Sequence, residues 1–161
     1  MFKSRSLLLA VLALSVPASF AATTTTTFSV IATVATSCTL VGGVPLAFGV
    51  VTPGVTDDAT TTFTSLCTIG TPYTLSLSVG TGTGATFAAR HMTSGPDSLA
   101  YSLYTDAGRT TVWGDGTAGS SAVSSTGSGV LQTFTVYGRI PSSATANIGA
   151  YIDTITVTAT Y

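Results

Sequence analysis

The sequence has little charge, since only 7% of its 161 residues are Asp, Glu, Lys or Arg. An ordinary soluble domain carries roughly 25%, so the polar surface must be built from Thr, Ser and Gly. Beyond residue 21 there is no Lys, and three Arg face six Asp, which leaves a net charge of −3. No basic patch exists, and this excludes nucleic-acid binding, because neutralising phosphates takes clustered Lys and Arg.

The side chains that usually carry catalysis are equally scarce. His91 is the one histidine, and no Gly-x-Ser-x-Gly motif accompanies it, so a Ser-His-Asp hydrolase is a weak alternative. Glu is absent, so a glycosidase would need two Asp residues. Asp57 and Asp58 are neighbours, and on a strand they would point to opposite faces. We therefore predict that the protein is not an enzyme.

Metal and cofactor sites have little support. Calcium binding by loop residues such as Asp106 or Asp115 stays open, although Asp115 followed by Gly is typical of a turn. The Gly-rich run 80–84 resembles a phosphate loop only superficially, because no helix pattern follows it. The sequence predicts no metal, no cofactor and no catalytic residue.

The first 21 residues have the pattern of a secretory signal peptide. Lys3 and Arg5 form a charged start, an apolar run covers 7–16, and small residues precede the end at Ala21. The run is too short to span a bilayer stably, so a retained anchor is the weaker alternative. Export of about 140 residues as one domain is expected.

Two cysteines, Cys38 and Cys67, are present. In a secreted chain two cysteines most simply form one disulfide, which would stabilise the fold by about 3–4 kcal/mol. Metal binding is the weaker alternative, because one His offers too few companion ligands.

Residues 22–38 form an uncharged stretch of mostly Thr, Val and Ile without Pro or Gly. Such a stretch favours an extended strand. It alternates, with Phe28, Val30, Ala32 and Val34 on one face. Two interpretations stay open: an ordinary first strand of a β-sandwich, or a detachable strand that completes the sheet of a neighbouring subunit.

Short alternating segments separated by turns continue to the end of the chain. Asp57 and Asp58 are assigned to a solvated loop, Arg90–Met92 to a stretch between loops, and Gly114–Gly129 to a mobile loop. No helical period longer than one turn occurs, so we predict an all-β sandwich. The predicted strands are Leu46–Val51, Thr60–Ile69, Tyr73–Val79, Leu99–Thr105, Thr110–Trp113, Val130–Ile140 and Ala150–Tyr161.

The inward faces of these strands give a candidate core. Core or rim packing is the expected role of most aromatic residues on them, although a sugar-binding platform stays an alternative for Tyr101, Tyr104, Trp113, Tyr137 and Tyr151. The residues predicted to point inward are Tyr73, Leu75, Leu77 and Val79. Phe63, Ser65 and Cys67 are predicted to share one face of their strand, and Leu99, Tyr101 and Leu103 one face of theirs.

Several segments together resemble one family, in order and over essentially the whole mature chain. They are residues 71–75, 103–106 with 109–116, 136–141 and 149–157, which include Leu-Tyr-Thr-Asp, Val-Trp-Gly-Asp-Gly and Gly-Ala-Tyr-Ile-Asp-Thr. These segments resemble the spore coat protein U domain family, which includes pilins of the archaic, Csu-type chaperone-usher pathway.

The resemblance implies an incomplete immunoglobulin-like β-sandwich, here 37–161, with an N-terminal donor strand, 22–36, that fills the groove of the next subunit. Cys38 and Cys67 match the family's disulfide position. The implied partners are identical or related pilins, a periplasmic chaperone and an outer-membrane usher. The implied donor side chains are Phe28, Val30, Ala32 and Val34, and the implied chaperone-binding residues on the last strand are Ile155, Val157, Ala159 and Tyr161.

The function expected from the resemblance is that of a structural subunit of a pilus or fimbria. It would pass through the periplasm to the cell surface, or be secreted, and support adhesion and biofilm formation without stable membrane insertion. Two rivals stay open: a spore or cell-surface coat protein of the same fold, and a secreted carbohydrate-binding module.

Overall fold

The computed structural model describes residues 20–161. The predicted signal peptide, 1–21, lies almost entirely outside the described residues. The chain divides into two units, residues 1–33 and 34–161. Among residues 20–161 no helix is found, and so none that could cross a membrane.

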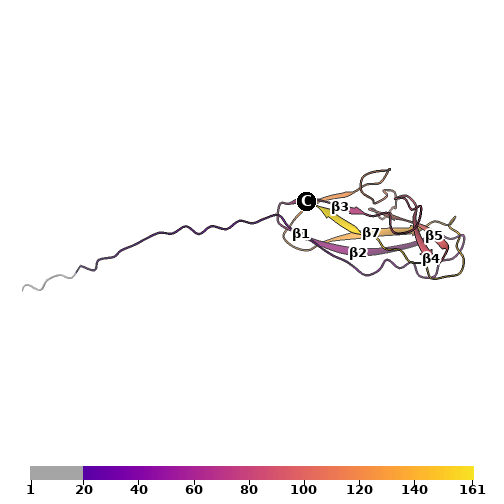
Figure 1. Cartoon of the computed structure of the whole chain (residues 1–161), viewed down its shortest axis with the longest axis horizontal. Helices are drawn as coiled ribbons and strands as arrows, with labels where there is room; N and C mark the ends of the chain where they lie inside the picture. Colours follow the sequence, from indigo (N-terminus) through magenta and orange to yellow (C-terminus); the bar gives the residue numbers. More distant parts are fainter. Residues whose placement is uncertain (1–19) are drawn as a thin grey trace, which may run out of the picture. The chain divides into compact units, whose positions relative to one another are not determined.

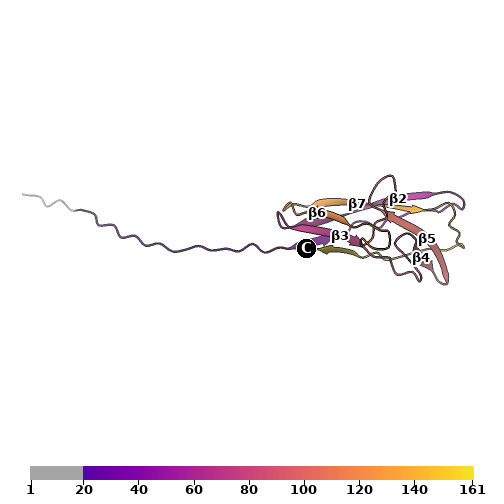
Figure 2. The same cartoon turned by 90° about the horizontal axis from the view of Figure 1, so that it is seen from above.

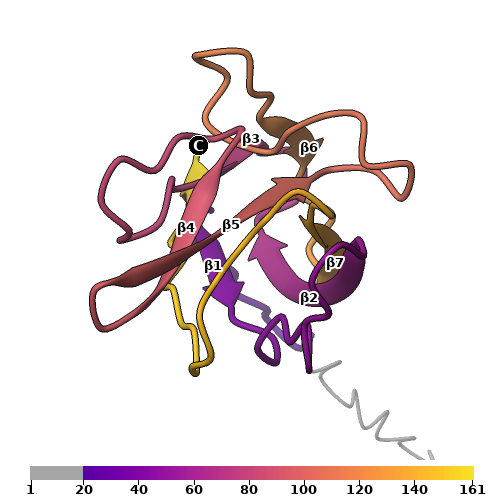
Figure 3. The ribbon, with the colours of Figure 1, turned by 90° about the vertical axis from the view of Figure 1, so that its right-hand side faces the viewer.

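The second unit is an antiparallel β-sandwich of two sheets (Figures 1 and 2). The five-stranded sheet has the order β1 (Cys38–Val41), β2 (Asp57–Cys67), β7 (Gln132–Ile140), β5 (Asp97–Tyr104) and β4 (Arg90–Ser94). The three-stranded sheet has the order β6 (Val123–Thr126), β3 (Pro72–Leu77) and β8 (Val157–Thr160). Figure 3 shows the β4–β5 hairpin along its length, in front of the other strands. The predicted all-β, incomplete immunoglobulin-like sandwich is confirmed.

The core lies between the sheets and is built by side-chain alternation along the strands. On β2, Phe63, Ser65 and Cys67 are 6%, 0% and 1% exposed. Of the residues predicted to point inward, Tyr73, Leu75 and Leu77 on β3 are buried, whereas Val79 lies beyond β3 and is half-buried. Leu99, Tyr101 and Leu103, which share one face of β5, are buried as well. The longest alternating apolar segments therefore form the walls of the sandwich as predicted.

Trp113 and Arg90 are the largest fully buried side chains. The indole Nε1 of Trp113 donates to the Leu75 carbonyl at 3.1 Å. The Arg90 guanidinium donates to the carbonyls of Ser78, Phe87 and Trp113 at 2.9, 3.0 and 2.6 Å. Burial lowers the pKa of Arg90, and these three carbonyl contacts compensate its charge inside the protein.

A disulfide fastens the edge strand β1 to β2, as expected for the two cysteines. Cys38 and Cys67 are bonded and are also register partners in the β1–β2 ladder. β1 has only four residues and pairs with β2 alone, so the bond holds a short strand that has little sheet support of its own.

Three predicted strands are wrong or shorter than expected. Leu46–Val51 is not a strand, because no neighbouring strand pairs with it. Thr110–Trp113 contributes only isolated bridges, to Tyr104 and Ser121. The final strand covers only 157–160 within the predicted Ala150–Tyr161, with an isolated bridge from Ile152 to Thr93 before it.

Three predicted loops contain strands instead. Asp57 and Asp58 begin β2, where Asp58 accepts two hydrogen bonds of 2.8 Å from its register partner Arg139. Arg90–Met92 belongs to β4, which pairs with β5. Gly114–Gly129 contains β6, which pairs with β3. These segments are polar, so only their sheet partners make them strands.

Candidate strand-binding groove

A large groove opens in the unit formed by residues 34–161. Its volume is about 1180 Å³, and its two walls are segments 42–53 and 144–157, both without regular structure except for Val157 at the start of β8. The floor is apolar and comes from strands of both sheets: Phe63, Leu77, Met92, Leu99, Tyr101, Leu103, Val136 and Ile140.

The first wall is held by a hydrogen bond from Thr61 Oγ1 to the Val44 carbonyl at 2.5 Å and by two apolar side chains. Leu46 and Phe48 pack over Gly138 of β7, where an added Cβ would lie 2.9 Å from each of them. Phe48 also meets the Tyr101 ring edge to face, with centroids 6.2 Å apart. Among the described residues, the backbone of 45–51 makes no hydrogen bond to other backbone groups. This wall is therefore apolar and unpaired.

The second wall continues into the free edge of β8. Ser78 N donates to the Thr156 carbonyl at 3.0 Å, and in an antiparallel ladder successive residues direct their backbone groups to opposite sides. The backbone N–H and C=O groups of Ile155, Val157 and Ala159 therefore point away from β3. No strand in the described part of the chain pairs with β8 on that side.

β1 has a matching free edge. The Ser37 carbonyl accepts from Thr68 N at 2.9 Å, so the backbone groups of Cys38 and Leu40 point away from β2 by the same alternation. Two unpaired sheet edges and an apolar floor thus occur in one sandwich. An extended segment could satisfy both.

The four residues predicted on the last strand differ in their surroundings. Ile155 and Val157 line the groove, whereas Ala159 lies beyond it and packs against the core. Tyr161 is 59% exposed. The alternation predicted for this stretch is present, with Ile155, Val157 and Ala159 half-buried and the Thr residues between them exposed.

Asp153 is the one charged side chain among the described residues that line the groove. Its Oδ1 accepts from Thr81 N at 2.7 Å and Thr81 Oγ1 at 2.8 Å, and its Oδ2 accepts from Tyr101 Oη at 2.7 Å. Burial alone would raise the pKa of Asp153, but these hydrogen bonds outweigh burial and lower the pKa overall. The carboxylate is therefore ionised at neutral pH. Sequence reasoning missed this residue's place in the groove.

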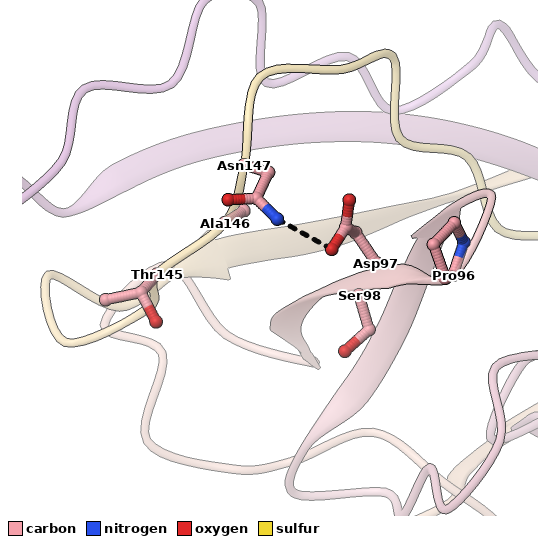
Figure 4. Close-up of a pocket in the computed structure, with 6 residues that line it drawn as sticks. All are labelled: Pro96, Asp97, Ser98, Thr145, Ala146 and Asn147. Atoms are coloured by element: carbon pink, nitrogen blue, oxygen red, sulfur yellow. Dashed lines mark hydrogen bonds between the residues drawn. The ribbon is translucent and has the colours of Figure 1, made fainter.

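A smaller polar pocket lies where the second wall meets the β4–β5 turn (Figure 4). Its volume is about 400 Å³. Asn147 Nδ2 donates to Asp97 Oδ1 at 2.8 Å, and Tyr151 Oη donates to the Asn147 carbonyl at 2.9 Å. With the Thr93–Ile152 bridge, these bonds fasten the wall to the hairpin.

Residues 20–37 belong to no strand, so the alternative of an ordinary first strand is wrong. The side chains of Phe28, Val30 and Val34 are 85%, 84% and 83% exposed, and Ala32 is exposed as well. An apolar alternating segment is thus left without a sheet. Its role as a donor strand stays a prediction.

The other residues considered for catalysis, metal binding or sugar binding take part in local hydrogen bonds or in the core. His91 Nδ1 lies 3.0 Å from the Thr83 carbonyl. Asp106 and Asp115 accept hydrogen bonds from their own turns, and these bonds lower the pKa of both carboxylates. Among residues 20–161 no three metal-ligating side chains gather. Trp113 is 1% exposed, so its place in a sugar platform is wrong.

An antiparallel sandwich whose open apolar groove lies beside the unpaired edge of β8 belongs to the class of incomplete immunoglobulin-like sandwiches. The sequence matches the family model of the Spore Coat Protein U domain over residues 24–158. This match covers most of the chain, and the chain belongs to that family.

The fold is similar to a chain in the crystal structure of the CsuC–CsuE chaperone–tip adhesion subunit pre-assembly complex, from archaic chaperone-usher Csu pili of Acinetobacter baumannii. The TM-score is 0.56 at 22% sequence identity, and the likeness covers 80% of this chain and 40% of that one. This likeness shows the fold. A search of curated proteins found no match.

Proposed function

We propose that this protein is a structural subunit of a surface fibre assembled by a chaperone-usher pathway. In the fibre, the N-terminal extension of one copy, 22–36, fills the groove of the next copy. The observation that carries the proposal is the groove itself, with its apolar floor and the unpaired edge of β8, in a chain that also has an unpaired, alternating apolar segment.

The groove and the extension have complementary needs. Exposing the apolar floor to water is unfavourable, and so is burying backbone groups without hydrogen-bond partners. A strand with Phe28, Val30, Ala32 and Val34 toward the floor supplies backbone partners and apolar side chains together. Full burial of a side chain the size of Val or Phe contributes about 1.5–3 kcal/mol, so the three larger residues together stabilise the contact substantially.

The proposal includes partners and a route. Residues 1–21 direct export, and the domain then spans 37–161. A periplasmic chaperone binds the edge formed by the last strand before assembly, through Ile155, Val157, Ala159 and Tyr161, and an outer-membrane usher passes the subunit to the surface. There the fibre supports adhesion and biofilm formation. The protein's role is structural rather than enzymatic.

A coat protein is the second candidate, favoured by the description of the matched family. The same contact between extension and groove would build a layer around a cell or spore instead of a fibre. Electron microscopy of the producing cell, with and without the gene, distinguishes fibres from a continuous coat.

The sharpest test compares two variants, each with one added carboxylate, on opposite faces of the extension. Val30→Asp puts a carboxylate into the apolar groove, whereas the matched Ile31→Asp faces the other way because successive side chains of a strand alternate. We expect Val30→Asp to abolish fibres on the cell surface and Ile31→Asp to retain them. Deleting residues 22–34 should leave a subunit that a chaperone binds but that cannot polymerise.

Normal fibres from the deletion variant would refute the proposed function. Equal effects of the two Asp variants would refute the assigned faces while leaving the deletion result to decide the function.

A further inference from the structure

A carboxylate in an otherwise uncharged groove needs an explanation. Of the described residues that line the groove, only Asp153 carries a charge, and it sits in the second wall near the floor residue Tyr101. A charge at such a place costs free energy unless it is well bonded. Its hydrogen bonds from Thr81 and Tyr101 meet that need and fix the carboxylate in place.

No cation at the groove surface neutralises this carboxylate. Burial lowers the pKa of the Arg90 guanidinium and the charge of Asp153 acts to raise it, but Arg90 is 0% exposed. Its three guanidinium nitrogens donate to the carbonyls of Ser78, Phe87 and Trp113. The ion pairs of the described chain join Asp58 to Arg109 and Arg139 and do not include Asp153.

We propose that Asp153 makes the groove select its donor strand by charge, rejecting strands that bring a carboxylate near it. The inference rests on the proposed function and names a specificity-determining residue of the same groove. Two like charges close together at low effective dielectric repel strongly, whereas a cation at the same place is attracted. Asp153 thus excludes acidic segments from the groove. Without this carboxylate, the apolar groove would discriminate less between apolar strands with and without an acidic residue.

The chain's own extension meets this requirement. Residues 22–37 contain no charged side chain, although the rest of the mature chain has twice as many Asp as Arg. A second copy of this chain is therefore an acceptable donor, and a segment with an Asp or Glu facing the groove near Asp153 is not.

The test uses labelled peptides with the sequence of residues 22–36 and the full mature chain as receptor. Each peptide carries Asp, Lys or the neutral control Asn at one of the positions 28, 30, 32 and 34. Affinity is measured by fluorescence anisotropy on the wild type and on Asp153→Asn, a variant of nearly the same shape that keeps an acceptor oxygen for Thr81.

We expect one or two positions at which the Lys peptide binds at least about tenfold more tightly than the Asp peptide, since a tenfold ratio corresponds to only about 1.4 kcal/mol. On Asp153→Asn this Lys-to-Asp ratio should fall to about one. If Asp153 served only to anchor the loop at Thr81, Asp153→Asn would change the affinity for all peptides equally and leave the Lys-to-Asp ratio unchanged.

A ratio near one at all four positions on the wild type would overturn the inference, as would a ratio that survives in Asp153→Asn. If Asp153→Asn fails to fold, the wild type alone decides: raising the ionic strength should shrink the ratio, because salt screens charge interactions, and a salt-independent ratio would overturn the inference. Failure of the unsubstituted peptide to bind would instead refute the proposed function.

Discussion

Removing the disulfide should cost the sandwich a large part of its stability. Cys38 and Cys67 are 29 residues apart, and closing a loop of that length restricts the unfolded chain by about 3.6 kcal/mol in the chain-entropy model. The unit 34–161 should unfold with an entropy of about 0.27 kcal/mol/K. The ratio of these values predicts that the melting temperature falls by about 13 °C.

The assay is thermal unfolding followed by circular dichroism. The double variant Cys38→Ala/Cys67→Ala is compared with the wild type in the oxidised state and after reduction. Reduced wild type keeps both sulfur atoms, so it separates the loss of the crosslink from the loss of packing around Cys67, which is 1% exposed. Reductant should not change the melting temperature of the double variant, which serves as its own control.

A fall of less than about 4 °C in both reduced wild type and the double variant would refute this reasoning. It would mean that β1 is held by its ladder to β2 and by side-chain packing, and that the crosslink adds little. β1 also has a free edge, so a large fall should be accompanied by weaker binding of the extension peptide.

Two further predictions concern stability. The hydrogen bonds from Arg139 lower the pKa of Asp58. The stabilisation by Asp58 is therefore present above the unfolded pKa of about 4 and is lost as the pH falls through the lower folded value. Because the side chain is 36% exposed, Asp58→Asn should cost about 0.5–1 kcal/mol in urea unfolding at pH 7 and progressively less as the pH falls below about 4; a cost that stays constant with pH would contradict the ion-pair account. Gly138→Val should cost about 1–3 kcal/mol, because its side chain would collide with Leu46 and Phe48; a melting temperature equal to that of the wild type would show that this wall does not rest on β7.

Sequence alone predicts the main walls of this fold well. β3, β5 and β7 alternate over six or more residues with mostly apolar side chains inward, and the alternation of β2 buries Phe63, Ser65 and Cys67. Burial favours that periodicity whatever the neighbouring strands are. β4 and β6 escaped prediction because they are short and polar. β4 is extended because it pairs with β5, and β6 because it pairs with β3. Such pairing between distant segments cannot be read from the local sequence.

The site is predictable in part for a related reason. The extension and the last strand both have alternating apolar and polar side chains, so Val30 and Val157 can be selected from the sequence alone. Leu46–Val51 has a strand-like pattern but lacks a partner strand; Pro45 precedes it and Gly49 interrupts it. Asp153 has no local signal for its place in the groove, because Thr81 and Tyr101 reach it from distant parts of the chain.

The two walls of the groove differ in firmness. Segment 144–157 is fastened at Asp97, Thr93 and Ser78, while 45–51 has no backbone ladder and rests on Leu46 and Phe48. The wall formed by 144–157 is therefore held more firmly than the segment 45–51 of the other wall. If the extension fills the groove as proposed, a wall without a backbone ladder would let one groove receive both the large ring of Phe28 and the small methyl group of Ala32.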